Sequence, residues 1–261
     1  MLERGLFQSR EKARASIMAG IIFVDGQRYD KAGSLINPDS EIIVKEDLCP
    51  YVSRGGLKLE KAIAVFNISL KGAICMDIGA STGGFTDCML RNGALKVYCI
   101  DVGYGQLDWK LRNDPRIVNM EKVNIRYLVK DKISDTIDFI SIDVSFISLK
   151  LVFPVAAGIL KPEGEMVCLV KPQFEAGRAQ VGKNGIVRDK EVHCAVLENT
   201  LKAAAANGLE VTGISYSPMT GAKGNIEYLL ALKKSANCRD CETDKIREVV
   251  DEAHERIGGQ L

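Results

Sequence analysis

The amino-acid sequence predicts an α/β protein in which helices cover both faces of a parallel sheet. From Arg54 onward, short apolar runs alternate with helical patterns, and this alternation is typical of parallel strands joined by helical crossovers. No internal repeat interrupts the series, so we expect one sheet domain over residues 49–235. The predicted strands are Ile74–Ile78, Val97–Asp101, Ile117–Met120, Phe139–Asp143, Glu165–Val170, Leu209–Ser217 and Ile226–Leu232.

Residues 1–48 predict a separate, small α+β module. A helix is expected to begin at Ser9, because serine is a good N-cap, and to end at Gly20. Asp25-Gly26 signals a tight hairpin turn, and it lies between the apolar runs Ile21–Val24 and Ile42–Val44. Two flanking segments are predicted as a linker and as a peripheral C-terminal helix, namely Lys45–Ser53 and residues 236–261.

Composition narrows the class of protein. The 261 residues carry 35 Lys and Arg against 34 Asp and Glu, and the net charge of +1 excludes a broadly basic nucleic-acid coat. Three of the eight cysteines (Cys75, Cys99 and Cys168) lie in apolar runs, as reduced core thiols of a cytoplasmic protein do. Cys238 and Cys241 lack a second ligand pair, so we expect no metal site. We also expect no membrane span, because charged residues interrupt the most apolar stretch.

The stretch from Asp77 to Phe85 carries the clearest chemical signal. An apolar strand leads into a turn of small residues and then into a helix. Glycines allow a ligand to approach the backbone, and a helix N-terminus offers free N–H groups. The glycines at 79, 83 and 84 fit neither the dinucleotide fingerprint nor the phosphate loop of nucleotide triphosphatases. Asp101 ends the next strand, where an acid can accept hydrogen bonds from ribose hydroxyls. A glycine-rich turn with an aspartate cap is the alternative.

Four charged residues accompany the glycine loop, and two of them, Asp143 and Lys171, lie at the expected ligand edge of the sheet. Asp143 and Lys171 end neighbouring strands, Lys58 lies on the helix before the first strand, and Glu227 begins the last strand. Charged groups beside apolar runs are costly unless they are paired or used. Taken singly, Lys58 fits a solvated helix residue and Asp143 fits a strand-end cap. Their occurrence together with the glycine loop favours a catalytic group.

Six segments carry a resemblance to a known family: YVSRGGLKLEKA, DIGASTGGFTD, DVGYGQL, SIDVSFISL, VKPQFE and GNIEYLL. The chain resembles the TlyA (hemolysin A) group of FtsJ-like methyltransferases, which modify ribose 2′-hydroxyls of ribosomal RNA. The resemblance implies a Rossmann-like fold that uses S-adenosylmethionine. It implies a catalytic tetrad of Lys58, Asp143, Lys171 and Glu227. The cofactor-binding residues that it implies are Asp77, Gly79, Ser81, Gly83, Gly84, Asp101, Asn124 and Asp143.

The N-terminal module similarly resembles an S4-like RNA-binding domain, shortened at its first helix. The resemblance rests on Ser9–Ala13, Val24–Gly26 and Lys31. It implies RNA contacts by Arg10, Lys12, Arg14 and Lys31. On charge alone, Arg10 and Arg14 fit phosphate contact and plain solvation equally well, because both lie on one helix face.

These patterns predict an enzyme that methylates ribose 2′-hydroxyls of ribosomal RNA, free or in ribosomal subunits. Lys171 is the candidate base, because a ribose hydroxyl must lose its proton. Glu227 and Lys58 would orient the hydroxyl and Lys171, and Asp143 would face the methyl-bearing end of the cofactor. No membrane and no obligatory protein partner are expected. The alternatives are a hemolysin-type membrane-active protein and an RNA-binding or ribosome-assembly factor without catalysis.

Overall fold

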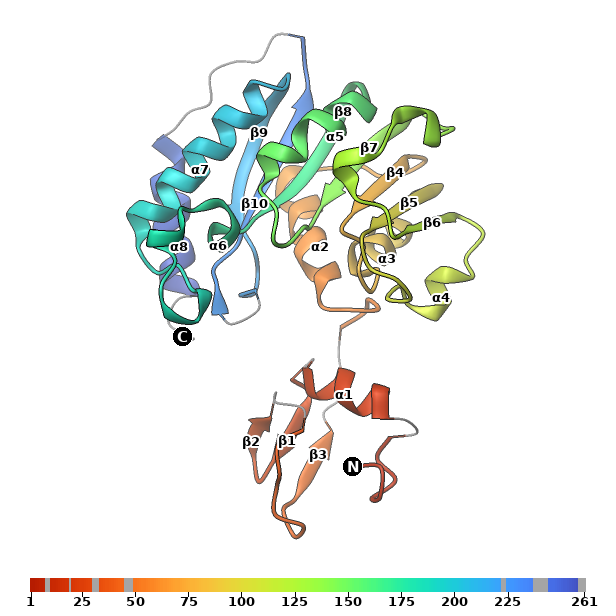
Figure 1. The fold of residues 1–261 in the computed structure, drawn as a ribbon, viewed down its shortest axis with the longest axis vertical. Coiled ribbons are helices and arrows are strands. Elements are labelled where there is room, and N and C mark those ends of the chain that lie inside the picture. Colours follow the sequence, from red (N-terminus) through yellow and green to blue (C-terminus); the bar gives the residue numbers. More distant parts are fainter. Residues whose placement is uncertain are drawn as a thin grey trace. The chain divides into compact units, whose positions relative to one another are not determined.

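The computed structural model describes residues 1–7, 10–18, 20–29, 33–44, 49–221, 224–236 and 244–257. The chain divides into two compact units, Met1–Arg54 and Gly55–Leu261 (Figure 1). The second unit also contains the C-terminal segment, for which the sequence predicts a peripheral helix.

The first unit combines one helix with a three-stranded antiparallel sheet. The helix is α1 (Arg10–Met18), and the strands β1 (Ile22–Val24), β2 (Gln27–Tyr29) and β3 (Ile42–Val44) have the order β2-β1-β3. Asp25 and Gly26 both have positive φ values, 49° and 77°, as the tightest hairpin turns require. Ala13 and Ile22 form its small buried core. Ser9, Lys31 and residues 45–48 of the linker lie outside the described residues.

The second unit contains a seven-stranded sheet with the order β6-β5-β4-β7-β8-β10-β9. Its strands are β4 (Ile74–Ile78), β5 (Lys96–Asp101), β6 (Ile117–Glu121), β7 (Ile137–Ile142), β8 (Leu160–Val170), β9 (Leu209–Tyr216) and β10 (Tyr228–Lys234). Strands β4 to β8 are parallel, as predicted. Strand β10 runs antiparallel to both β8 and β9, which departs from a fully parallel sheet. Eleven residues (217–227) connect β9 to β10, fewer than the dozen or more that a crossover between parallel neighbours needs.

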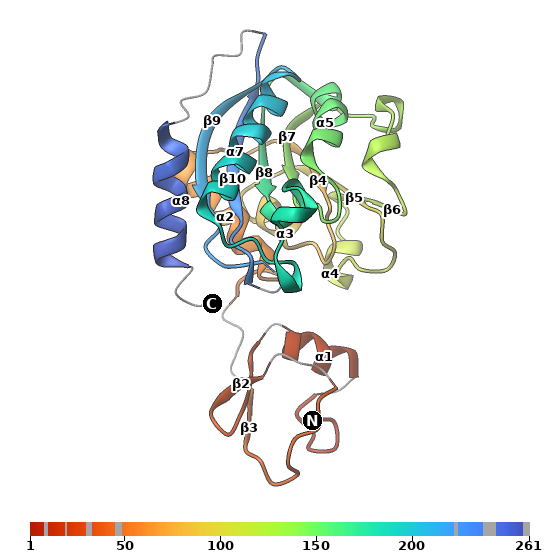
Figure 2. The same ribbon diagram turned by 60° about the vertical axis from the view of Figure 1, so that its left-hand side comes forward.

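Helices cover both faces of this sheet (Figures 1 and 2). The helices are α2 (Gly55–Phe66), α3 (Gly84–Arg91), α4 (Trp109–Arg112), α5 (Phe153–Ile159), α6 (Pro172–Glu175), α7 (Lys190–Ala205) and α8 (Asp244–Arg256). Short 3₁₀ turns occur at Ile125–Tyr127, Lys130–Lys132, Leu149–Leu151, Arg178–Gln180 and Lys183–Gly185. In Figure 1, α5 and α7 lie in front of the sheet, and α2 and α3 lie behind it. Helix α8 packs against α7 and β9.

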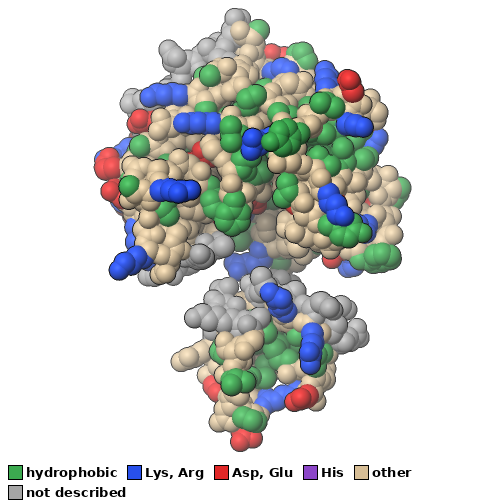
Figure 3. All heavy atoms as spheres, in the orientation of Figure 1, with side chains coloured by type: hydrophobic (Ala, Val, Ile, Leu, Met, Phe, Trp, Pro, Cys, Tyr) green, Lys and Arg blue, Asp and Glu red, His purple; other side chains and the backbone are tan. Residues whose placement is uncertain are grey.

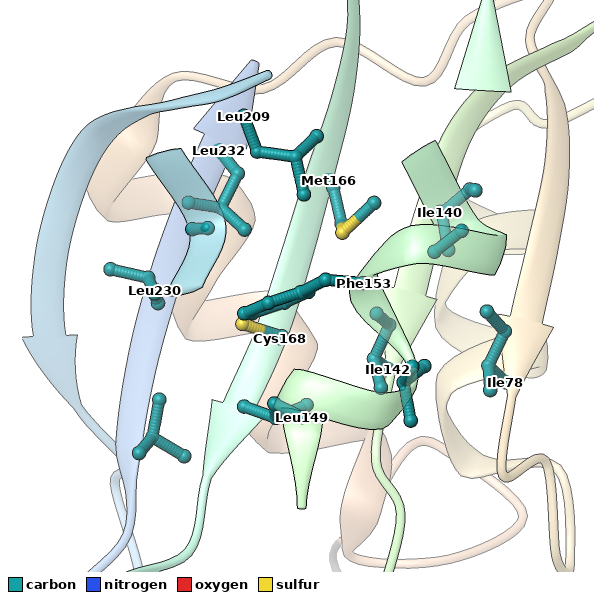
Figure 4. Packing of buried hydrophobic residues seen from close by; sticks show 14 of the residues in the cluster. Ile78, Ile140, Ile142, Leu149, Phe153, Met166, Cys168, Leu209, Leu230 and Leu232 are labelled. Atoms are coloured by element: carbon teal, nitrogen blue, oxygen red, sulfur yellow. The ribbon is translucent and has the colours of Figure 1, made fainter. Parts of the chain in front are cut away.

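The core follows the two-residue alternation of the strands. Met76, Ile140 and Cys168 belong to one large cluster under α5, α7 and α8, where Phe153 of α5 is fully buried (Figure 4). Helix α8 adds Ile246, Val250, Ala253 and Ile257 to this cluster. The predicted core thiols are confirmed, because Cys75, Cys99 and Cys168 are free and buried. In the described part of the chain, no helix has both the length and the apolarity needed to cross a membrane.

His193 of α7 is a buried polar anchor within this core. One ring nitrogen, Nδ1, lies 2.6 Å from the Tyr228 hydroxyl of β10, and Nε2 lies 3.0 Å from the Val187 carbonyl oxygen. Burial lowers the pKa of His193 to about 4. The imidazole is therefore neutral near pH 7, and it ties α7 to β10 and to the chain before α7.

Candidate active site

A cavity opens where the strand order reverses. The chain runs from β4 outward to β5 and β6, and then returns to β7 and β8 on the other side of β4. Ligands bind at such a reversal, beyond the carboxyl ends of the strands. The cavity here has a volume of about 650 Å³. Five predicted cofactor residues line it: Gly79 and Ser81 after β4, Asp101 at the end of β5, Asn124 after β6 and Asp143 after β7.

Asp101 joins two of the loops around this cavity. Its Oδ2 accepts a hydrogen bond from the Ser81 backbone N–H at 2.8 Å, and its Oδ1 accepts one from the Gly103 backbone N–H at 2.7 Å. A carboxylate oxygen has two lone pairs, so both oxygens can accept further hydrogen bonds from a ligand. Asn124 is fixed at the start of a 3₁₀ turn, where its Oδ1 accepts from the Arg126 N–H at 3.1 Å.

Three predicted cofactor residues do not line the cavity: Asp77, Gly83 and Gly84. Asp77 is fully buried and accepts hydrogen bonds from Thr86 at 2.7 Å and Ser141 at 2.9 Å. Burial raises its pKa to about 6. These hydroxyls belong to α3 and β7, so Asp77 ties the elements on either side of the glycine loop.

Two structural features at Gly83 favour glycine. Its φ is +95°, and a Cβ there would lie 2.2 Å from Leu111 Cδ1. The positive φ favours glycine whether or not a ligand approaches, and the leucine side chain of α4 would have to shift to admit a Cβ. Gly84 begins α3 and is buried. Contact of Asp77, Gly83 or Gly84 with a cofactor stays a prediction.

The four charged residues lie close together, in two ion pairs. Lys58 Nζ is 2.6 Å from Glu227 Oε2, and these side chains are 11% and 3% exposed. Lys171 Nζ is 2.5 Å from Asp143 Oδ1, with 11% and 21% exposure. Burial raises the pKa of Glu227, the positive charges of Lys58 and Lys171 oppose that rise, and the charge of Asp143 adds to it. Glu227 is therefore within electrostatic reach of all three partners.

The sheet register explains how residues so distant in sequence meet. Tyr228 of β10 pairs with Val170 of β8, so the preceding Glu227 lies across from Lys171 at the same edge. Asp143 follows directly after β7, the parallel neighbour of β8. The strand expected to end at Asp143 ends one residue earlier, at Ile142. The side chain of Asp143 therefore lies at the cavity. Lys58 reaches the same point from α2.

Several residues around this group escaped the sequence analysis. Ser145 Oγ accepts a hydrogen bond from Lys171 Nζ at 3.0 Å, whereas Asp143 Oδ1 makes a close charge contact without hydrogen-bond alignment. A Cβ on Gly221 would lie 1.9 Å from Glu227 Oε1. Buried Asn225 binds the chain around Val187, since its Oδ1 accepts from the Val187 N–H at 3.0 Å. Ser145 and Asn225 belong to quoted motifs, which is the signal that could have identified them.

The predicted RNA residues can be placed only in part. Arg10 and Arg14 are exposed on α1, and both line a shallow cavity of the first unit. Lys31 and the side chain of Lys12 lie outside what is described. Within the described residues, no group of three or more His, Cys, Asp or Glu side chains could hold a metal ion. Cys238 and Cys241 lie outside that part of the chain.

Comparison with known proteins matches this geometry to a family. A Bacillus subtilis (strain 168) protein provisionally named rRNA methyltransferase YqxC is 50% identical over 261 residues, or 98% of this chain and 93% of the relative. The 16S/23S rRNA (cytidine-2′-O)-methyltransferase TlyA of Mycobacterium tuberculosis (strain ATCC 25618 / H37Rv) is 40% identical over 89% of this chain and 87% of the relative. A solved Streptococcus thermophilus structure, described provisionally as a hemolysin, is 49% identical, covers 99% of this chain and 94% of that one, and has a TM-score of 0.83.

The profile of the FtsJ-like methyltransferases matches residues 51–234. This range includes the glycine loop, the cavity and all four charged residues. With its Rossmann-like sheet and this match over most of its length, the chain belongs to the FtsJ-like methyltransferase family.

Proposed function

We propose that this enzyme transfers the methyl group of S-adenosylmethionine to a ribose 2′-hydroxyl of ribosomal RNA. The observation that carries the proposal is the pairing of Lys58 with Glu227 and of Lys171 with Asp143, beside a cavity that Asp143 also lines. The name of the Mycobacterium tuberculosis relative states a 2′-O-methylation of rRNA, and this supports the same reaction here. Work on ribosomal RNA would take place in the cytoplasm.

The cavity residues suit an adenosyl cofactor. Its volume of about 650 Å³ is in the range of small-molecule sites. The Asp101 oxygens have acceptor capacity for two ribose hydroxyls, and the apolar wall of Ile100, Val102 and Ile125 suits a flat adenine ring. Asp143 places a negative charge at the end of the cavity opposite Asp101. S-adenosylmethionine would supply a methyl group that is activated by the positive charge on its sulfur.

The side chains beside the cavity can position and deprotonate a ribose hydroxyl. In-line methyl transfer depends mainly on alignment, and the amine of Lys171 is held between Asp143 and Ser145. From there Lys171 Nζ, in its neutral amine form, would accept the hydroxyl proton as the methyl group moves from sulfur to the ribose oxygen. Glu227, whose Oε2 is held by Lys58, would orient the ribose hydroxyl and Lys171. Breaking a buried pair of this kind leaves an uncompensated charge and costs about 3–5 kcal/mol. Because Glu227 also interacts electrostatically with Lys171 and Asp143, we infer that the four residues act as a unit.

We propose that the first unit is an S4-like domain that binds the RNA. The exposed Arg10 and Arg14 lie one turn apart on α1, a spacing that suits two phosphates. With a net charge of +1 for the whole chain, RNA contact would depend on local patches. Figure 3 agrees with this, because Lys and Arg side chains are scattered over the visible face of the second unit and form no broad patch.

The decisive experiment is a methyl-transfer assay on defined RNA. The full chain is incubated with methyl-labelled S-adenosylmethionine and small subunits, large subunits or free rRNA. We expect label in RNA, at a position where alkaline cleavage is blocked because the 2′-hydroxyl is methylated. Label in a base would contradict the site of modification. Binding of rRNA without transfer would instead identify an RNA-binding or assembly factor.

A substitution at Gly79 tests the cofactor site. A Cβ at Gly79 would lie 2.3 Å from the backbone oxygen of Asp143, so alanine would force the glycine loop away from the end of β7. We expect Gly79→Ala to weaken binding of S-adenosylhomocysteine by about tenfold or more, a loss of about 1.4 kcal/mol. Isothermal titration calorimetry measures this affinity.

Gly72→Ala is the matched control for this substitution. Gly72 has a similar φ of +77°, but no atom lies within 4 Å of its Cβ position. Its replacement should therefore cost only backbone strain of about 1 kcal/mol and leave the affinity unchanged. Equal loss of affinity in both variants would mean that strain, and not the contact with Asp143, determines the effect.

A further inference from the structure

Two segments lie side by side at the carboxyl edge of the sheet. Residues 145–149 follow β7, and residues 171–175 follow β8. Contacts join the two segments in the same order along each segment. Lys171 Nζ donates to Ser145 Oγ at 3.0 Å, and the rings of Phe174 and Phe146 are 4.9 Å apart. The last contact is made by Glu175.

Glu175 holds the other segment by both backbone and side chain. Its Oε1 accepts from the Leu149 N–H at 2.7 Å, and its Oε2 accepts from Ser148 Oγ at 2.6 Å. Ser148 Oγ in turn accepts from the Lys150 N–H at 3.2 Å, at the start of the 3₁₀ turn Leu149–Leu151. Burial raises the pKa of Glu175, and its two hydrogen bonds oppose that rise. Such bonds offset the cost of a half-buried carboxylate.

The segment that Glu175 holds is part of the candidate active site. Asp143, Ser145 and Ser148 line the cavity, and Ser145 is also the hydrogen-bond acceptor for Lys171. Between them, Phe146 has a φ of 62°, a left-handed conformation that is unfavourable for a residue with a side chain. Such a conformation persists only where the surrounding structure holds it. Here the contacts of Ser145 and Ser148 hold it from both sides.

We propose that Glu175 is a positioning residue for methyl transfer. By fixing residues 145–149, it sets both the wall of the cofactor cavity and the hydroxyl that holds Lys171. The proposal rests on the function proposed above. It predicts that loss of the Glu175 carboxylate affects turnover and cofactor affinity together, although Glu175 itself touches neither reactant.

The test compares three variants of the full chain. Glu175→Ala removes both hydrogen bonds. Glu175→Gln keeps the shape, with an oxygen for the Leu149 N–H and an amide that can donate to Ser148 Oγ. Asp138→Ala is the matched control, because Asp138 also accepts from one backbone N–H (Ile74, 2.8 Å) and one side chain (Lys161, 2.6 Å), at the opposite end of β7.

For each variant, kcat, the dissociation constant of S-adenosylhomocysteine and the melting temperature are measured. We expect Glu175→Ala to lower kcat by about 10- to 100-fold, as small misplacements of reacting groups do, and to weaken binding of S-adenosylhomocysteine. Glu175→Gln should restore both quantities. Asp138→Ala should lower the melting temperature and leave kcat and affinity at their wild-type values. If Glu175→Ala folds poorly, Ser148→Ala, which removes one of the two bonds, should give the same changes at smaller size.

Two outcomes would overturn the proposal. One is a Glu175→Ala variant that loses thermal stability while keeping its kcat and affinity, as the Asp138 control should. The other is a Glu175→Gln variant as impaired as the alanine variant. A wild-type protein that binds S-adenosylhomocysteine but methylates no rRNA would overturn the proposed function instead. The affinity comparison among the variants would still decide the role of Glu175.

Discussion

Replacing Lys171 by alanine is expected to lower methyl transfer to rRNA by about 10²- to 10⁴-fold, the usual contribution of a general base. The affinity for S-adenosylhomocysteine should barely change, because Lys171 is not among the residues that line the cavity. Asp143→Ala should behave differently. Asp143 lines the cavity and also contacts Lys171, so its loss should weaken both cofactor binding and turnover. Single-turnover rates and calorimetric affinities separate the two effects.

Two further variants make the Lys171 result interpretable. Lys171→Arg keeps the positive charge but stays protonated at any working pH, so it should fail almost as badly as alanine. Lys161→Ala removes a lysine of β8 that is paired with Asp138, at the opposite end of β7. This variant should transfer methyl groups normally. If Lys171→Arg retains near-normal rates, Lys171 acts only as a positive charge, and the proton leaves by another route.

Deleting residues 1–48 is expected to lower methylation of ribosomal RNA strongly while leaving cofactor binding intact. The second compact unit contains the whole sheet, the cavity and all four charged residues. Without the proposed RNA-binding unit, kcat/KM on ribosomal subunits should fall by about 100-fold or more, a loss of about 2.7 kcal/mol. Filter binding of labelled rRNA should show a parallel loss of affinity.

A full-length chain with Arg10 and Arg14 both changed to alanine tests the same proposal with a smaller change. It should lose part of the RNA affinity and reduce its salt dependence, because each phosphate contact releases counterions. A truncated chain that methylates rRNA as well as the whole chain does would show that the first unit is not the RNA-binding part.

Much of the second unit could be predicted because its signals are local. Mostly apolar runs of four to six residues predict the parallel strands, and the Rossmann-like fold is confirmed. The chain direction then implied that Asp143 and Lys171 would meet, since both follow parallel strands at one edge. Their ion pair agrees with that expectation, while the catalytic roles of the four residues stay predictions.

The features that could not be predicted depend on contacts between distant segments. The close approach of the Leu111 side chain to Gly83 joins two segments that lie far apart in the sequence. The contact between Glu175 and Ser148 depends on how two loops leave neighbouring strands. Nothing in the sequence of helix α7 reveals that His193 Nδ1 lies 2.6 Å from the Tyr228 hydroxyl of β10. Pattern and spacing describe one segment at a time, whereas these contacts require the assembled sheet.

The position of β10 determines when the enzyme becomes complete during its own synthesis. Lys58 leaves the ribosome 169 residues before Glu227, its partner. Until β10 enters between β8 and β9, β8 has an open edge, and the ammonium of Lys58 has no carboxylate from Glu227 beside it. An open strand edge is a site for association with other chains. We therefore expect a nascent chain that stops before Glu227 to be inactive and prone to aggregation, so that methylation starts only after nearly the whole unit has been made.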